Sequence, residues 1–264
     1  MIGLVVQFCH AQILLKNVTL PIFVSSGNTF EFHCRFVLPK QFYSAKRYVP
    51  QRGGMEIVMK NVAVFVSGGG TNLQVLLDAW ERGEIPDGRP ALVLSSRAEA
   101  YALKRAESRG VPTVVVPRKN YTDREAYTEA LCCEMEKHDI DVIVLAGFLS
   151  IFGEKLVHKY PNRIINVHPS LIPSFCGEGF YGLHVHEAAL ARGVKVTGAT
   201  VHLVNEVCDG GPILLQKAVD VLDGDTPETL QRRVMEQAEW VLLPRALQML
   251  CSGEYELKTE THRQ

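Results

Sequence analysis

Patterned cysteines and long apolar segments are both missing from this sequence of 264 residues. Its seven cysteines are scattered and odd in number, which excludes the disulfide framework of a small secreted domain. None of them shows the spacing of a zinc site, so we expect no metal. Polar side chains interrupt the apolar first twenty residues, which therefore match neither a membrane span nor a clear signal peptide. These absences predict a protein of the reducing cytoplasm.

An excess of charge of one sign is also missing. The formal net charge is −1 and the pI is about 6.8, so no basic surface for nucleic acid is expected. Three common motifs are absent as well: the Gly-x-Ser-x-Gly elbow of serine hydrolases, the Walker phosphate loop and the spaced glycines of dinucleotide-binding domains. With 47% apolar and 22% charged residues, the chain has the composition of an ordinary globular protein with one large or two small domains.

Residues 1–58 differ from the rest of the chain because they show no sustained periodicity. A regular pattern begins only after two internal methionines, Met55 and Met59. Two hypotheses account for this change: translation starts at one of these methionines, or the preceding residues form a small N-terminal extension. We therefore expect three parts: an upstream or disordered extension over 1–58, a main domain over 59–252 and a tail over 253–264.

Short apolar strands alternate with helical patterns from residue 60 to residue 168. Strands are predicted at 62–66, 91–94, 113–116, 141–146 and 164–168, and helices at about 73–82, 98–109, 123–137 and up to 160. Successive strand–helix units predict an α/β fold with a doubly wound, mostly parallel sheet. In such sheets, ligands bind outside the carboxyl ends of the strands.

A glycine-rich loop, Ser-Gly-Gly-Gly-Thr-Asn at 67–72, joins the first predicted strand to the first helix. Backbone N–H groups at a helix N-terminus bind anions, and glycines let a ligand approach the backbone closely. Thr71 or Asn72 can cap the helix or bind the anion, and a monophosphate is the simplest ligand. The alternative is a tight turn without a ligand.

Asn166 and His168 stand at the end of a buried apolar strand, just before Pro169. Residues two apart in a strand point to the same face. An amide can hold a carbonyl oxygen and an imidazole can give or take a proton, so the pair suits chemistry on a carbonyl group. The alternative is a buried polar pair satisfied by backbone. This pair, the glycine loop and the apolar loop 147–152 should share one edge of the sheet, which favours the functional interpretation.

Beyond residue 174 the pattern changes to strands at about 194–204 and 212–221, joined by a short loop that ends in glycines. This arrangement predicts an antiparallel addition to the sheet. Asp209, just before the two glycines, is a candidate to bring a carboxylate to the site. The alternative is an ordinary Asp-Gly turn.

The last helix should begin near Thr226 and Pro227. We expect no full capping box, because Thr229 stands where an acidic partner is needed. The helix should extend to about Met249, with a kink at Pro244.

Two further groups of residues are weak candidates. His184 and His186 could bind a metal, but no third ligand accompanies them. Lys104, Arg105 and Arg109 are most simply the solvated face of a helix.

Taken together and in order, four motifs resemble the phosphoribosylglycinamide formyltransferase family. They are Ser-Gly-Gly-Gly-Thr-Asn at 67–72, Leu-Ala-Gly-Phe at 145–148, Asn-Val-His-Pro-Ser-Leu-Ile-Pro at 166–173 and Asp-Gly-Gly-Pro at 209–212. The Asn-x-His-Pro-Ser-Leu core is shared with other formyl-folate enzymes, whereas Thr71-Asn72 in the glycine loop indicates the glycinamide ribonucleotide branch. The resemblance covers residues 60 to about 249.

The resemblance implies a Rossmann-like formyltransferase fold and direct transfer of the formyl group of 10-formyltetrahydrofolate to the amine of glycinamide ribonucleotide, in purine biosynthesis. It implies that the partners are small molecules, and leaves the oligomeric state open. The implied catalytic residues are Asn166, His168 and Asp209. The implied acceptor-binding residues are Gly70, Thr71, Asn72 and Glu239, although the spacing around Glu239 differs from the family by one residue. The implied folate-binding residues are Arg124, Leu149, Ser150, Ile151, Phe152 and Asn166.

Two features depart from the family pattern. The family often has arginine where Ser150 stands, and the 175–182 loop is longer than in some members. Three alternatives remain. A methionyl-tRNA formyltransferase would need a basic RNA-binding domain, and a formyltetrahydrofolate hydrolase would need an N-terminal regulatory domain. A sugar-phosphate binding module without catalysis would have no use for the Asn166, His168 and Asp209 set.

Overall fold

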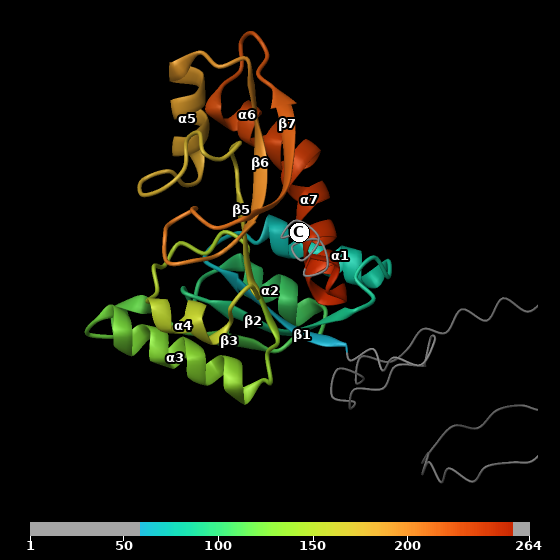
Figure 1. The fold of residues 1–264 in the computed structure, drawn as a ribbon, viewed down its shortest axis with the longest axis vertical. Helices are drawn as coiled ribbons and strands as arrows, with labels where there is room; N and C mark the ends of the chain where they lie inside the picture. The colour runs from blue at the N-terminus through green and yellow to red at the C-terminus, as the bar shows by residue number, and fades with distance from the viewer. Residues whose placement is uncertain (1–58, 256–264) are drawn as a thin grey trace, which may run out of the picture. The chain divides into compact units, whose positions relative to one another are not determined.

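A seven-stranded sheet, with strand order β3-β2-β1-β4-β5-β6-β7, organises the part of the chain that the structure describes (Figure 1). This computed structural model describes residues 59–255. The predicted extension over 1–58 and most of the predicted tail, residues 256–264, lie outside the described residues. No helix within 59–255 combines the length and apolarity needed to cross a membrane.

The strands are β1 (Lys60–Val66), β2 (Gly88–Ser95), β3 (Thr113–Val115), β4 (Val142–Leu145), β5 (Ile164–His168), β6 (Val196–Leu203) and β7 (Ile213–Asp220). The α-helices are α1 (Thr71–Glu81), α2 (Tyr101–Ser108), α3 (Arg124–Lys137), α4 (Glu154–Lys159), α5 (Leu183–Arg192), α6 (Pro227–Val234) and α7 (Trp240–Ser252). A 3₁₀ turn, η2 (Arg118–Asn120), precedes α3, and a π-helix, η3 (Met235–Glu239), joins α6 to α7.

Pairing within the sheet divides it at β5. Strands β1 to β5 are parallel to their neighbours, whereas β5 pairs antiparallel with β6, and β6 with β7. The predicted doubly wound sheet with an antiparallel C-terminal addition is therefore confirmed. The chain runs from β1 to β2 on one side and later to β4 on the other, and the carboxyl ends of β1 and β4 flank the point where ligands bind in such sheets.

The alternation of side chains along β1 explains how the sheet is covered on both faces. Val62, Val64 and Val66 pack in the apolar core that includes residues of α1 and α7. Ala63 and Phe65 point to the other face and pack in a second core with residues of α3. A strand buried on both faces must be apolar throughout, which is why this segment has no polar side chain after Asn61.

Three local predictions need correction. The second helix begins at Tyr101 rather than residue 98, because the Ser95 hydroxyl bonds to both backbone groups of Arg97 and holds a turn there. The expectation of an incomplete capping box at α6 was wrong: Thr229 Oγ1 accepts from the Thr226 N–H at 2.9 Å, while Thr226 Oγ1 accepts from the Thr229 N–H. A hydroxyl thus replaces the acidic partner.

The last predicted helix is also not uniform. It ends at Ser252, close to the predicted Met249, but a π-helix of five residues interrupts it at Met235–Glu239. A π-turn accommodates one extra residue in a helix, and such turns are frequent at functional sites. Its position coincides with the region where the spacing differs from the family by one residue.

Candidate active site

Three loops meet at the carboxyl ends of β1, β2 and β4. The Ser67 hydroxyl, just after β1, lies 2.6 Å from the Ser96 hydroxyl after β2. Ser67 Oγ also accepts a hydrogen bond from the Leu149 N–H after β4, at 2.9 Å. These buried contacts hold the glycine loop beside the apolar loop, as the sheet topology predicts.

The glycine loop ends at Gly70, which is the N-cap of α1 and has a left-handed backbone with φ of +73°. No side chain of the described residues caps the helix, so the N–H groups of its first turn remain directed outward. A Cβ atom at Gly70 would lie 2.6 Å from the Ala102 Cβ, which shows how closely α2 approaches. The loop therefore has the form of an anion site built from backbone, with Thr71 exposed at its rim.

Arg105 binds the glycine loop, so the prediction that it belongs to a solvated helix face was wrong. Its Nε donates to the Gly69 carbonyl at 2.8 Å and its Nη1 to Gln74 at 2.9 Å. Arg109 is paired with Asp78 and Glu81 on α1. These arginines fasten α2 to α1, and Arg105 places a positive charge beside the loop.

The π-helix brings Glu239 to the same loop. Asn72 Nδ2 donates to Glu239 Oε2 at 2.8 Å, and Glu239 is only 6% exposed. Burial raises the pKa of Glu239 to about 7, although the Asn72 hydrogen bond opposes the shift. The buried Asn72 Oδ1 has no hydrogen-bond partner in the described part of the chain. Two residues predicted to bind the acceptor, far apart in sequence, are thus in direct contact.

The Asn166, His168 and Asp209 side chains converge at the end of β5. Asn166 Nδ2 lies 3.3 Å from Asp209 Oδ1, and His168 Nδ1 lies 3.4 Å from Asp209 Oδ2. The His168 and Asp209 side chains are 5% and 9% exposed. Asp209 has a left-handed backbone with φ of +53°, in the tight loop between β6 and β7. That loop is a turn, as the alternative interpretation held, and it also places the carboxylate against the imidazole.

Hydrogen bonds on both sides of the His168 ring decide where its protons lie. Nε2 is 2.8 Å from the Phe175 carbonyl oxygen, which can only accept, so Nε2 carries a proton. Nδ1 faces the Asp209 carboxylate and takes a second proton when the ring is charged. Burial lowers the pKa of His168, and Asp209 and the Phe175 carbonyl counteract this shift. Burial alone would raise the pKa of Asp209, but His202, His168 and the Gly177 N–H together lower it.

His202 is a member of this cluster that the sequence did not single out. In the sheet register it stands opposite Asn166. Its Nδ1 donates to the Leu203 carbonyl at 2.8 Å, and its Nε2 lies 3.2 Å from Asn166 Nδ2 and 3.5 Å from Asp209 Oδ1. His202 thereby contacts both side chains and holds the Asn166 amide in place. A signal was present, because His202 lies two residues after Thr200 with an apolar residue between them, but this spacing alone does not show the partner strand.

The predicted folate residues lie at and beside the loop after β4. Leu149 is 51% and Ile151 is 65% exposed, whereas Phe152 packs inward against Phe148, with ring centroids 6.4 Å apart. Arg124, the first residue of α3, is exposed and lies beside the loop's end, where a Cβ at Gly153 would be 3.9 Å from its Cγ. Exposed apolar side chains next to the catalytic edge are typical of a binding surface for a flat ring system.

Ser150 lies between these two exposed residues and near the buried Tyr127 hydroxyl. That hydroxyl has no hydrogen-bond partner within residues 59–255. Burial raises the pKa of Tyr127, and the nearby Ser150 hydroxyl lowers it. The guanidinium of Arg118 stands over the Tyr127 ring, 5.7 Å from its centroid.

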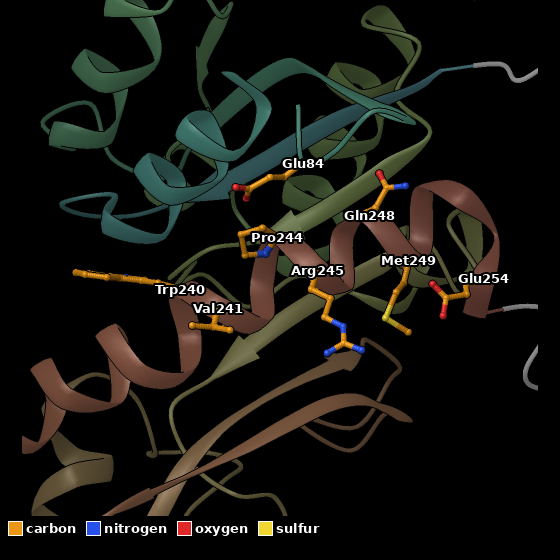
Figure 2. Close-up of a pocket in the computed structure, with 8 residues that line it drawn as sticks. All are labelled: Glu84, Trp240, Val241, Pro244, Arg245, Gln248, Met249 and Glu254. Carbon is orange, nitrogen blue, oxygen red and sulfur yellow. The ribbon is translucent and has the colours of Figure 1, made fainter. Parts of the chain in front are cut away.

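A separate cavity of about 400 Å³ lies along α7 (Figure 2). Its lining includes Trp240, Pro244, Arg245 and Glu84, and none of the residues predicted for the site lines it. Trp240, which follows Glu239 in the chain, is part of this lining, but the cavity does not include the candidate catalytic side chains.

The two candidate metal-binding histidines do not form a shared site. His184 is exposed and bonds to Glu187 at 2.9 Å, whereas His186 is fully buried, and neither of its ring nitrogens has a hydrogen-bond partner among residues 59–255. Burial lowers the pKa of His186 to about 4. No group of three or more potential metal ligands occurs within the described range.

The family model of formyl transferases matches residues 60–247 of this chain. The chain belongs to the formyl transferase family. The match covers the whole sheet and, in the described part of the chain, α1 to α7 except the end of α7. The resemblance inferred from the four motifs is therefore confirmed.

Several members of the formyl transferase family are similar over most of the described chain. The phosphoribosylglycinamide formyltransferase of Haemophilus influenzae is 37% identical over 200 residues, which are 76% of this chain and 91% of the relative. The human trifunctional purine biosynthetic protein adenosine-3 is 42% identical over 196 residues, 74% of this chain. This chain spans only 19% of that human protein.

Solved structures agree with this assignment. The crystal structure of glycinamide ribonucleotide transformylase 1 from Symbiobacterium toebii matches with a TM-score of 0.69 and 42% identity, covering 74% of this chain and 89% of that one. The phosphoribosylglycinamide formyltransferase structure from Brucella melitensis matches with a TM-score of 0.66 and 42% identity, covering 73% of this chain and 96% of that one.

Proposed function

We propose that this protein transfers a formyl group from 10-formyltetrahydrofolate to the amine of glycinamide ribonucleotide, in the cytoplasm, as a step of purine biosynthesis. The observation that carries the proposal is the meeting of an amide, an imidazole and a carboxylate beside a backbone anion site. Both substrates are small molecules, and the mechanism uses neither a metal nor a nucleic acid.

The glycine loop binds the phosphate of the acceptor. The outward N–H groups at the start of α1 and the nearby Arg105 supply positive potential for a phosphate. Glu239 belongs to the same subsite because it bonds to Asn72. A carboxyl group with a pKa of about 7 can donate or accept a hydrogen bond near neutral pH, and so can adapt to a polar group of the acceptor.

The folate donor fits the surface formed by the loop after β4. Leu149 and Ile151 offer apolar contact to its ring system, and Arg124 offers a positive charge to its carboxylates. When bound, the donor supplies the activated formyl group. The residues of the chain position that group against Asn166 and His168.

The catalytic side chains stabilise negative charge on the formyl oxygen as the amine attacks. Asn166 and His168 can each donate a hydrogen bond to this oxygen. Burial keeps the pKa of His168 low in the absence of that charge, whereas an oxyanion at one ring nitrogen and Asp209 at the other both favour the protonated ring. The stabilisation therefore grows as the reaction proceeds, which is what catalysis requires. Asp209 can also relay the proton of the amine through water.

An assay with three acceptors tests the proposal. Purified protein is given 10-formyltetrahydrofolate with glycinamide ribonucleotide, with initiator methionyl-tRNA, or with water alone, and the formylated product or free formate is measured. We expect formyl transfer only to the ribonucleotide. Transfer to the tRNA, or formate release without an acceptor, would indicate a different formyl-folate enzyme, and no reaction at all would indicate a binding module.

A further inference from the structure

Every hydrogen-bond donor of the catalytic side chains is engaged within the protein in this conformation. The Asn166 amide faces His202 Nε2 at 3.2 Å and Asp209 Oδ1 at 3.3 Å. The His168 ring faces the Phe175 carbonyl at Nε2 and Asp209 at Nδ1. A formyl oxygen can be stabilised only if it displaces one of these acceptors.

Of these acceptors, the Phe175 carbonyl is the one that an incoming oxygen can displace most easily from its donor, His168 Nε2. His202 and Asp209 hold the amide and ring through side chains from β6 and the β6–β7 loop, whereas Phe175 belongs to the 175–182 loop at the rim of the site. Its oxygen lies 2.8 Å from His168 Nε2, the distance expected for an oxyanion bound at the same nitrogen. This backbone oxygen therefore holds the ring N–H that a bound oxyanion would otherwise accept from.

The same loop also contacts the third catalytic residue. The Gly177 N–H donates to Asp209 Oδ2 at 2.9 Å, so two residues of one loop hold both His168 and Asp209. A change at Phe175 therefore affects the ring directly and the carboxylate through its neighbour.

The backbone at Phe175 is in a conformation that a residue with a Cβ disfavours. Its φ is +49°, in the left-handed region, where an aromatic residue is uncommon. Gly177 and Gly179 also have positive φ, of +91° and +87°, but glycine adopts these values without strain. The His168–Phe175 hydrogen bond is thus made by a strained segment, which favours its release when a better acceptor arrives.

We propose that Phe175 is a positioning residue whose carbonyl oxygen stands in for the formyl oxygen at His168 Nε2 and is exchanged for it when the substrates bind. This inference rests on the proposed function for the identity of the incoming oxygen. Before exchange, the carbonyl keeps Nε2 protonated and the ring correctly oriented. After exchange, the same N–H donates to the developing oxyanion.

Two substitutions at one position separate the backbone strain from the loss of the aromatic ring. Phe175→Ala and Phe175→Gly both remove the contact with Phe180, whose ring centroid is 6.4 Å away. Only glycine relieves the left-handed strain, so Phe175→Gly should hold the carbonyl on His168 more firmly than Phe175→Ala does. The equilibrium constant for release of the carbonyl from His168 Nε2 should differ roughly fivefold between the two variants.

The first measurement is kinetic. Exchange predicts that kcat/KM for formyl transfer is roughly three- to fivefold lower in Phe175→Gly than in Phe175→Ala, while the thermal stability of the glycine variant is equal or higher. Equal kcat/KM values, or a more active glycine variant, would overturn the proposal and leave the carbonyl as a permanent orienting group.

The second measurement does not depend on turnover. Nitrogen-15 NMR of the histidine rings reports exchange of the His168 Nε2 proton with solvent in the free protein, with His168→Ala identifying the resonance. We expect slower proton exchange in Phe175→Gly than in Phe175→Ala, and equal rates would contradict the proposal. A wild-type protein that transfers no formyl group would count against the proposed function, whereas equal exchange rates would count against this inference alone.

Discussion

The two sides of the candidate site are built in different ways. On the side of β1, β2 and β4, the candidate anion site is made mainly of backbone: a left-handed glycine and the first turn of α1. On the side of β5, β6 and β7, the chemistry depends on side chains that reach across strands, with His202 opposite Asn166 and Asp209 against His168. Backbone sites require local geometry, whereas side-chain sites require a correct register between distant segments.

This difference predicts where mutations act. Changes on the backbone side should alter stability and the binding of the acceptor, and changes on the side-chain side should alter the rate of transfer. Four predictions test this separation, from the largest expected effect to the smallest.

Removing the catalytic charge should have the largest effect. Asp209→Asn keeps an acceptor for the Gly177 N–H but removes the charge that favours protonated His168, and His168→Ala removes the donor itself. Each should lower kcat by about 10² or more, the scale for losing acid–base help or an oxyanion donor. Asp223→Asn, an exposed carboxylate of the same half, is the matched control and should change little. Unchanged turnover in both catalytic variants would refute the assignment.

Glu239 should make stability depend on pH. Its pKa is raised by burial to about 7 from 4.5 in an unfolded chain, so the folded state binds its proton more tightly. The stabilisation is fully present below pH 4.5 and is lost as the pH rises through about 7.

Chemical denaturation of wild type and Glu239→Gln at pH 5 and pH 8 measures this effect. Between these pH values, the wild type should lose roughly 2.5 kcal/mol more of its free energy of unfolding than the variant does. Glu236→Gln, an exposed residue of the same π-helix, should behave like wild type. A wild-type curve parallel to that of Glu239→Gln would show that the carboxyl group is not protonated in the folded state.

Gly70→Ala tests the backbone side. The substitution adds a Cβ that would lie 2.6 Å from Ala102 Cβ and forces alanine into φ of +73°. We expect a loss of about 2–3 kcal/mol in the free energy of unfolding and a KM for the ribonucleotide that rises more than kcat falls. Gly68→Ala is the matched control for stability, because no atom of residues 59–255 lies within 4 Å of its added Cβ. If kcat falls as strongly as in Asp209→Asn, the division between binding and chemistry is wrong.

Ser150→Arg should have the smallest effect. If Ser150 is a tolerated change at the rim, restoring arginine should alter the KM for the formyl donor by less than about threefold, since an exposed charge contributes little. A tenfold or larger improvement would show that the folate surface of this chain lacks a contact that its relatives make.

Much of the fold was predictable because its signals are local. The apolar run of β1, the glycine loop and the helical spacing of α1 are all contained within about twenty consecutive residues. The α2 boundary and the α6 cap were predicted incorrectly for the same local reason: hydroxyl groups of Ser95 and Thr229 form backbone hydrogen bonds that composition does not reveal. The kink at Pro244 remains a prediction.

Within the candidate site, motifs identified Asn166 and His168 at the end of a buried strand before Pro169, and Asp209 in a loop before two glycines. Their distances were not predictable, because the β5–β6 register and the left-handed backbone of Asp209 together decide them. His202 and Phe175 were missed for this reason. His202 acts on Asn166, which stands opposite it on the neighbouring strand, and Phe175 acts on His168 through its backbone carbonyl.

The amino-acid sequence by itself determined the alternation of strands and helices, the glycine loop proposed to bind the anion and the candidate catalytic side chains, because these depend on neighbours a few residues apart. Only the tertiary structure decided which atoms meet: the π-turn that brings Glu239 to Asn72, the histidine that orients Asn166 and the carbonyl that holds His168. The strength of a hydrogen bond depends on distances of tenths of an ångström and on direction. Groups from segments that are tens of residues apart reach such distances only when the strands have paired in the folded sheet.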